Sequence, residues 1–512
     1  MASRVLGPRT PVLRAVPRPR SPPAQPAADA PATSAASARS RTRATVPHLP
    51  LRRLPPGRAT DAFSAVPDLP PRAARACRRR AETSGAARAP TRGVLSGTGV
   101  TMNRERAAVR TLAAELAEVA ARPEQQVKAE LWRRLSRLEP VRPLIWLQML
   151  EGSAWQDTDA EADLQCTDPF LRRCEIDLRR LLYQWRHQRA DLVFDDVVHS
   201  PLIVHTSGYG PAVRWDHPDH WFGASRFVPV IVDEADIDLL RVPEVTVDRE
   251  ATERLYQRHC DLYGDLLTVV KTGQRDFWFS IFDTFIQWRG VEQAFLDMLD
   301  RPAWLHRVLD RMTQALEVDL LARELQGAIS LNNGNVRVGS NGLGFTDELP
   351  GEGFTGTVRV RDMWAHASTQ IFADVSPAMH EEFALQYESR LLDRFGLVSY
   401  GCCEPLHRKV DIARKHLPKL RRISMSPWVD VEVGAAAVGK DLIFSYKPNP
   451  AIMAGDTWDL DALRRDFRRV LTATRGCAVE ILMKDLHTCN GHGQRMADWT
   501  RIGVEVAEEF AA

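Results

Sequence analysis

Residues 397–404 read LVSYGCCE, a short and largely apolar run that ends in a glycine, two cysteines and a glutamate. Short apolar runs that are bounded by turn residues and separated by amphipathic stretches are typical of buried strands. Eight candidates occur along the chain: 145–149, 192–194, 267–271, 368–372, 397–400, 422–425, 442–445 and 479–483. Strands that alternate with helices indicate an α/β protein with a parallel sheet, and eight such units predict a single (β/α)₈ TIM barrel.

The helices expected between these strands have recognisable ends. Ser376-Pro377 is typical of a helix start, and Gly396 is a suitable residue to follow the helix end. A later helix is expected to begin at Asp459 or Asp461 and to stop near Gly476. Ahead of the first strand, apolar residues at helical spacing predict helix over residues 103–139.

Two stretches, 205–227 and 331–356, do not fit a strand–helix unit. Long loops of this kind are usually lids or surface excursions. The first contains a cluster of aromatic and imidazole side chains: Trp215, His217, His220 and Trp221. We interpret this cluster as aromatic packing within a lid in preference to a metal or stacking site.

The composition changes sharply near Met102. Residues 1–101 contain 18 Arg, no Lys, four acidic residues and 16 of the 33 Pro, whereas the other 411 residues carry 50 basic and 62 acidic side chains. A segment with so few apolar side chains cannot bury a core. We therefore predict that residues 1–101 are a disordered Arg/Pro/Ala-rich tail, or upstream sequence ahead of a start at Met102, in preference to a nucleic-acid-binding or transit segment. Residues 102–141 form an N-terminal helical segment, and residues 142–512 form the barrel.

The remainder of the chain predicts a cytoplasmic protein. It has no run of 18 apolar residues and no signal peptide, and the eight cysteines of the whole chain are irregularly spaced. The acidic excess after Met102 argues against nucleic-acid binding, and no membrane partner is expected.

Polar residues that follow the candidate strands are the site candidates, because active sites of barrels lie at the carboxyl ends of the strands. They are Asp195, Asp196, Asp374, residues 400–404, residues 426–428, residues 447–450, Lys484, Asp485, His487, Cys489 and His492.

Several of these residues resemble motifs of the uroporphyrinogen decarboxylase superfamily, over about residues 140–510. The matching motifs are Arg142-Pro143 through Trp146-Leu147, LVFDDVVHSP at 192–201, QIFAD at 370–374, YKPNP at 446–450 and NGHG at 490–493. The superfamily comprises the decarboxylase of porphyrin metabolism and zinc-thiol methyltransferases that exchange methyl groups with corrinoid proteins. The resemblance implies catalytic roles for Asp196, His492 and Asp374, and substrate-binding roles for Arg142, Trp146, Lys447 and Asn449.

Departures from the decarboxylase pattern favour the methyltransferase branch. The loop after the first strand carries Glu151 where a polyanionic porphyrinogen needs cations, and residues 276–290 lack the expected Tyr. The methyltransferases hold zinc with an H-x-C motif and a distant Cys, and zinc keeps a substrate thiol ionised. Here Cys402 matches the motif but Tyr400 replaces its His.

The resemblance thus implies zinc bound by Cys402 and a distant Cys489. Glu404, Cys403, His487 and His492 are the alternatives for a third ligand. Each cysteine is otherwise a small buried residue, and Cys403 is expected to pack behind Cys402 because adjacent strand residues point in opposite directions.

The acid and base candidates also have structural interpretations. Asp196 and Asp374 are suited to turns or helix caps, and His492 to a hydrogen bond in a glycine-rich loop. For Lys447, a solvated rim position is preferred over a carboxylate anchor.

We interpret the chain as a zinc-thiol methyltransferase that exchanges a methyl group with a corrinoid protein or a related carrier. The alternative is a decarboxylase of a porphyrinogen or another carboxylated small molecule, and the second alternative is a non-catalytic ligand-binding barrel. The expected partners are a small-molecule substrate and a corrinoid protein, and a homodimer is the assembly considered.

Overall fold

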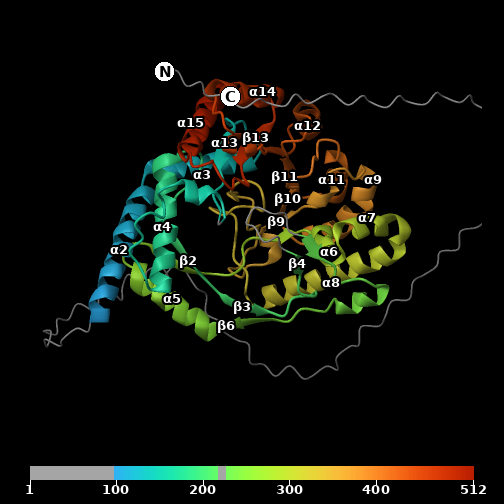
Figure 1. Cartoon of the computed structure of the whole chain (residues 1–512), viewed down its shortest axis with the longest axis horizontal. Coiled ribbons are helices and arrows are strands. Elements are labelled where there is room, and N and C mark those ends of the chain that lie inside the picture. The colour runs from blue at the N-terminus through green and yellow to red at the C-terminus, as the bar shows by residue number, and fades with distance from the viewer. Residues whose placement is uncertain (1–96, 151, 217–225, 512) are drawn as a thin grey trace, which may run out of the picture. The chain divides into compact units, whose positions relative to one another are not determined.

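The computed structural model describes residues 97–150, 152–216 and 226–511 (Figure 1). Most of the predicted tail, and Glu151, therefore lie outside the described residues. The first helix, α2 (Gly97–Ala120), crosses the boundary predicted at Met102. The helix predicted over 103–139 is confirmed as two helices, since α3 (Pro123–Ser136) begins separately. Proline suits the first position of a helix, where its missing N–H costs no hydrogen bond.

Seven parallel strands form the central sheet. Their order is β1 (Leu144–Leu147), β13 (Ala478–Met483), β12 (Ile443–Tyr446), β11 (Leu420–Met425), β10 (Leu397–Tyr400), β9 (Trp364–Ala367) and β8 (Trp278–Phe279). A second parallel pair joins β2 (Val197–Pro201) to β7 (Thr268–Thr272). The α/β class with a parallel sheet is confirmed. Among the described residues, β1 and β8 are the edge strands of this sheet, and no strand pairing joins them or connects them to the β2–β7 pair. The predicted TIM barrel is therefore not confirmed.

Two predicted strands are wrong. Residues 192–194 lie in no strand, and β2 begins only at Val197, so that Asp195 and Asp196 precede a strand instead of following one. Residues 368–372 follow β9 and contain a short 3₁₀ helix, Gln370–Phe372. The backbone N–H groups of Gln370 and Ile371 donate to the Asp283 carboxylate, which holds this apolar segment in a turn.

Helices surround the strands (Figure 1). They are α4 (Pro169–His187), α5 (Arg249–Tyr263), α6 (Ile281–Arg289), α7 (Val291–Asp300), α8 (Pro302–Leu325), α9 (Pro377–His380), α10 (Gln386–Leu392), α11 (Val410–His416), α12 (Val431–Val438), α13 (Ala451–Ala454), α14 (Leu460–Ala473) and α15 (Gln494–Glu509). The predicted N-terminal caps are confirmed, because Ser376 Oγ accepts from Met379 N and the Asp459 carboxylate accepts from Asp461 N and Ala462 N. Gly396 does not directly follow its helix, since α10 ends at Leu392. In the part of the chain that the structure describes, no helix has the length and apolarity needed to cross a membrane.

Residues 338–346, which we call the interior segment, are all buried. The prediction that 331–356 is a lid or surface excursion is therefore wrong for these residues. Two glycines explain how the backbone fits. A Cβ at Gly339 would collide with the His366 ring, and a Cβ at Gly342 would collide with Trp132 and Glu480.

The other long stretch differs. It contributes two short antiparallel pairs, β3 (Ile203–Thr206) with β6 (Val245–Asp248) and β4 (Arg214–Asp216) with β5 (Arg226–Val228). Trp215 is 47% exposed and packs against Phe227 with a ring separation of 4.4 Å. The other three members of the predicted aromatic cluster, His217, His220 and Trp221, lie outside the described residues.

Candidate functional site

The residues that directly follow the seven parallel strands form what we call the carboxyl edge. They are Gln148 after β1, Lys484 after β13, Lys447 after β12, Ser426 after β11, Gly401 after β10, Ser368 after β9 and Ser280 after β8. Ligands of parallel α/β proteins bind at this edge, because the strands direct their loops there. The perturbed titratable groups described below lie at or next to it.

A lysine lies against two neighbouring thiols at this edge. Lys484 Nζ is 3.1 Å from Cys402 Sγ and 3.5 Å from Cys403 Sγ, and the two sulfurs are 3.6 Å apart. The Asp485 carboxylate lies 2.5 Å from the same nitrogen. We call these four residues the thiol–lysine cluster. It joins the ends of β10 and β13, although β11 and β12 lie between them in the sheet.

The two thiols differ in exposure and in acidity. Cys402 is 2% exposed, whereas Cys403 is exposed. The hydrogen bond with Cys402, aided by the Lys484 ammonium and opposed by burial, lowers the pKa of Cys403 to about 7. The same hydrogen bond and burial raise the pKa of Cys402 well above its ordinary value. Of the two thiols, the exposed Cys403 is therefore the one that ionises near neutral pH.

Lys484 keeps its charge in this setting. Burial by itself lowers the pKa of Lys484, but the two cysteine sulfurs and the Asp485 carboxylate outweigh it and raise this pKa. An ammonium held beside a thiolate is a standard means of activating a cysteine nucleophile.

The prediction that Cys403 packs behind Cys402 is wrong, because the roles are reversed. Strand β10 ends at Tyr400, and Gly401 has a φ of +88°, so the alternation of side chains along the strand stops before either cysteine. Glycine is favoured at such a φ. This turn buries Cys402 and exposes Cys403.

Two buried carboxylates lie behind the thiols. Glu404 accepts from the backbone N–H of Cys402 at 2.9 Å and of Thr369 at 3.2 Å. Glu388 accepts from Thr369 Oγ1 at 2.9 Å and from Tyr400 OH at 2.8 Å. Both are 0% exposed, and burial raises the pKa of both carboxyls, that of Glu388 to about 8. We call Glu388, Glu404, Thr369 and Tyr400 the buried acid network.

Burial shifts the pKa values of three nearby titratable groups. His380 Nε2 lies 2.7 Å from Tyr400 OH, and Lys409 Nζ lies 3.2 Å from His380 Nδ1. Burial lowers the pKa of His380 to about 3 and that of Lys409 to about 8. Burial also raises the pKa of Asp283 to about 6. These groups orient the loops after β9 and β10.

Lys447 is one of several buried polar residues that contact the interior segment. It is 1% exposed and donates to Asn341 Oδ1 in the interior segment and to Ser445. The preferred rim position of Lys447 is therefore wrong. Glu480 accepts from the backbone N–H of Gly342 at 3.1 Å and pairs with Arg422 at 3.4 Å. These contacts satisfy polar groups that burial of the interior segment takes out of water.

The predicted zinc ligands do not come together. Cys489 is 0% exposed within the main hydrophobic core, and burial raises its pKa to about 12. Cys402 faces the Lys484 ammonium, and both Glu404 oxygens accept backbone N–H groups. His487 is exposed, with Nδ1 3.3 Å from Gly152 O. Among residues 97–150, 152–216 and 226–511, no three His, Cys, Asp or Glu side chains are grouped as metal ligands. Zinc binding by these residues stays a prediction.

The predicted catalytic residues are dispersed. Asp196 accepts from Thr268 Oγ1 at 3.0 Å at the start of the β2–β7 pair. Asp374 is exposed in the turn before α9, and His492 is exposed in the loop before α15. No hydrogen bond joins these three described side chains to the thiol–lysine cluster. Their catalytic roles stay predictions.

Three of the predicted substrate-binding residues contact other parts of the fold, through an ion pair, a hydrophobic cluster and a hydrogen bond. Arg142 precedes β1 and forms a bidentate pair with Asp191, at 2.6 and 2.9 Å. Trp146 is 6% exposed within a hydrophobic cluster. Asn449 Oδ1 accepts from Ala451 N at 3.0 Å, at the start of α13. Arg142 thus lies at the end of β1 opposite to the carboxyl edge.

Cys403 and Lys484 were both expected at strand ends, Cys403 as an alternative zinc ligand, but the contact between them was not predicted. Lys484 was recognised as following a strand, but nothing in the sequence shows that it reaches across two intervening strands to Cys402. The signal that was present is the pair of adjacent cysteines after a glycine, which favours a turn over a continued strand.

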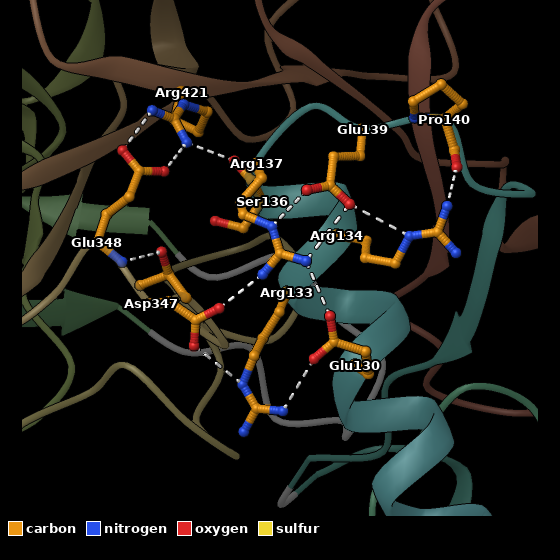
Figure 2. Close-up of polar contacts among 11 residues, drawn as sticks. Glu130, Arg133, Arg134, Ser136, Arg137, Glu139, Pro140, Asp347, Glu348 and Arg421 are labelled. Carbon is orange, nitrogen blue, oxygen red and sulfur yellow. Dashed lines mark hydrogen bonds and ion pairs between the residues drawn. The ribbon is translucent and has the colours of Figure 1, made fainter.

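The opposite, amino edge, formed by the residues just before the parallel strands, carries a network of ion pairs (Figure 2). Arg137 contacts Asp347 and Glu139, each at 2.6 Å, and Arg421 pairs with Glu348 at 2.8 Å. These bonds tie the end of α3 and the start of β11 to the chain directly after the interior segment.

A cavity of about 490 Å³ also opens at the amino edge. Its lining includes Leu138, Val141, Lys440, Arg475 and Phe510. The thiol–lysine cluster contributes nothing to this lining, so the cavity is not the substrate cavity of that cluster.

Comparisons with known proteins add little. No family model and no curated protein matches the sequence. Among solved structures, a methyltransferase from Methanosarcina mazei is similar over 75% of this chain and 99% of that chain, with 12% identity and a TM-score of 0.38. A similarity at that level carries no argument about activity.

Proposed function

We propose that this protein is an enzyme that transfers a methyl group through the Cys403 thiolate. One observation carries the proposal: Lys484 Nζ lies within 3.5 Å of both sulfurs of an adjacent cysteine pair, of which only Cys403 is exposed. Thiolates are the reactive form of cysteine, and a nearby cation increases their population at neutral pH.

The transfer requires no group beyond the methyl donor and these side chains. The Cys403 sulfur attacks the methyl carbon of the donor and forms a C–S bond. The bond between that carbon and the donor breaks, and its electron pair leaves with the donor. Cys402 keeps its proton throughout and acts only as a hydrogen-bond donor.

The methyl donor that the family resemblance implies is a methylated corrinoid protein, and we propose such a carrier as the partner. Lys484 supplies the positive charge beside the thiolate that zinc supplies in the methyltransferases. Turnover needs a second, stronger nucleophile that takes the methyl group from the Cys403 sulfur.

We also propose that the strands close into a TIM barrel. Adjacent strands are about 4.8 Å apart, so β10 and β13 would be separated by about 14 Å in a flat sheet. The contact of Lys484 with Cys402 therefore supports curvature of the sheet. The backbone N–H of Asp191, which precedes β2 in the chain, donates to Ile145 O of β1 at 2.9 Å. At the other end of the sheet, β7 directly precedes β8 in the order of elements along the chain. Both observations favour placing the β2–β7 pair between β1 and β8.

Methylcobalamin, a methylated corrinoid that is free of protein, is a suitable probe. The purified full chain is incubated with it anaerobically, and peptide mass spectrometry locates methyl groups. We expect methylation of Cys403, absent in Cys403→Ser and unchanged in Cys477→Ser, where the cysteine lies outside the cluster.

Absence of methyl from Cys403 in the wild type contradicts the proposal. Release of carbon dioxide from uroporphyrinogen in the same preparation then supports the decarboxylase alternative. If neither reaction occurs, the non-catalytic barrel is the better description.

A further inference from the structure

We infer that Cys402 and Cys403 form a redox-active pair in which a peroxide oxidises Cys403 and Cys402 then closes a disulfide with it. The inference rests on the proposed function only in taking Cys403 as the nucleophile of the site. It adds a modification site that reversibly removes this nucleophile.

The geometry assigns different roles to the two sulfurs. Cys403 is exposed and meets dissolved oxidants directly, while Cys402 is 2% exposed and is shielded from them. The sulfurs are already 3.6 Å apart, so closing the disulfide requires rotation of the two side chains and an adjustment of the peptide between them. An exposed thiolate next to a resolving thiol is the usual arrangement of a redox-sensitive cysteine.

Lys484 favours the first step. Its ammonium lies 3.5 Å from Cys403 Sγ and stabilises the thiolate that reacts with peroxide. The Asp485 carboxylate, 3.9 Å from the same sulfur, has the opposite charge and is itself paired with Lys484. The two charges partly cancel at Cys403, but the ammonium lies nearer the sulfur, so its stabilising effect on the thiolate is the larger one.

The two steps balance. The Cys403 thiolate attacks one oxygen of hydrogen peroxide, an S–O bond forms, the O–O bond breaks, and hydroxide leaves. The Cys402 sulfur then attacks the Cys403 sulfur, the S–S bond forms, and the S–O bond breaks. The thiol proton of Cys402 and the departing hydroxide give water, and the two cysteines together lose two electrons to the peroxide.

A disulfide between neighbouring residues is expected to be readily reduced. Consecutive Cα atoms are about 3.8 Å apart, whereas unstrained disulfides join Cα atoms at least about 4.4 Å apart. Strained disulfides have higher reduction potentials and belong to the labile, regulatory class. A small thiol should therefore restore both cysteines.

The other described cysteines are poorly suited to the same reaction. Cys166, Cys174, Cys260 and Cys489 are buried, and Cys477 is partly buried. Burial raises the pKa of Cys166, Cys174, Cys477 and Cys489. Oxidation at low peroxide should thus be confined to the adjacent pair.

The test uses the full chain with an equimolar to tenfold range of hydrogen peroxide. Thiols that remain are alkylated and counted by peptide mass spectrometry, before and after dithiothreitol. In the wild type we expect simultaneous loss of alkylation at Cys402 and Cys403, a mass two hydrogens lower for their shared peptide, and full recovery on reduction. Cys477→Ser should behave identically.

Two variants separate the steps. In Cys402→Ser, Cys403 should stop at the sulfenic acid, which dimedone traps. In Cys403→Ser, Cys402 should remain alkylatable at the same peroxide dose. Lys484→Gln should slow the loss of thiols, and Lys484→Arg should restore most of the rate.

Retention of both thiols, or oxidation of Cys403 to sulfinic acid in wild type and Cys402→Ser alike, overturns the inference. These outcomes are independent of methyl transfer. A disulfide that forms in a protein that methylcobalamin cannot methylate refutes the proposed function alone, and methylation without disulfide formation refutes the redox pair alone.

Discussion

The amino and carboxyl edges of the sheet differ in how their charged side chains are paired. At the amino edge several charges have close partners, as in the Arg142–Asp191 pair at 2.6 Å and the Arg421–Glu348 pair. At the carboxyl edge Lys484 is shared between an acid and two sulfurs, and Glu388 is buried without a cation. Paired charges hold elements together, whereas clustered groups with shifted pKa values are typical of functional sites.

This difference locates the chemistry better than cavity size does. The cavity of about 490 Å³ lies at the amino edge, among residues that connect β1, β13 and the C-terminal helix. The carboxyl edge has the Cys403 thiol, whose pKa is lowered, beside the Lys484 ammonium. We therefore expect variants at the amino edge to change stability alone, and variants at the carboxyl edge to change reactivity.

The largest expected effect is at the amino edge. Arg142→Met leaves Asp191, which is 1% exposed, without its cation. Breaking a buried ion pair by removal of one partner costs about 3–5 kcal/mol. Urea unfolding should show a loss of this size in the free energy of unfolding, while the alkylation rate of Cys403 in the folded protein stays unchanged. A loss of reactivity without a loss of stability would reverse the assignment of the two edges.

The second effect is a pH dependence from the carboxyl edge. Burial raises the pKa of Glu388 to about 8, so at neutral pH the folded protein holds a proton that the unfolded protein releases. Stability from this group should fall as pH rises from about 5 to 8, by up to about 1.4 kcal/mol per pH unit. Urea unfolding across this range should show the slope in the wild type and a flatter profile in Glu388→Gln. An equal slope in both proteins contradicts the protonated state of Glu388.

Third, removal of the Lys484 ammonium should lower the rate at which Cys403 is alkylated. In Lys484→Gln, the alkylation of Cys403 by iodoacetamide at pH 7 is expected to be about three- to tenfold slower, because the thiolate fraction falls as the pKa rises. Lys484→Arg keeps the charge and serves as the matched control. Equal rates in wild type and Lys484→Gln would show that Cys402 alone activates Cys403.

The smallest effect comes from the outer part of the amino-edge network. Arg133 pairs with Glu130 and Asp347, each at 3.4 Å, and its side chain is 30% exposed. Exposed ion pairs contribute about 1 kcal/mol or less. Arg133→Met should thus lower the free energy of unfolding by less than about 1 kcal/mol, well below Arg142→Met. A loss equal to that of Arg142→Met would show that the network acts as one unit.

The elements that local sequence determines were predicted well. The strand at 397–400 and the caps at Ser376 and Asp459 follow from apolar runs and capping side chains, and the structure confirms them. The strand predicted at 368–372 failed because the Asp283 carboxylate, distant in sequence, binds two backbone N–H groups of this segment.

The site was predicted less well, because its geometry depends on contacts between distant segments. Cys402 was correctly placed at a strand end, but the turn at Gly401 exchanged the roles expected for the two cysteines. Arg142 has a motif that suggests substrate binding, yet it lies before its strand and pairs with Asp191. Burial of residues 338–346 depends on bonds to Glu480 and Lys447, which no local pattern reveals.

The ionisation of Cys403 tests the account most directly. Cysteine labelled with ¹³C at Cβ reports the thiol and thiolate forms by NMR, and Cys403→Ser assigns the resonance. The account predicts that Cys403 in the folded wild type titrates with a pKa of about 7 and that this pKa rises in Lys484→Gln. A Cys403 thiol that titrates at or above about 8.5, the value of an unperturbed cysteine, in both proteins would contradict it.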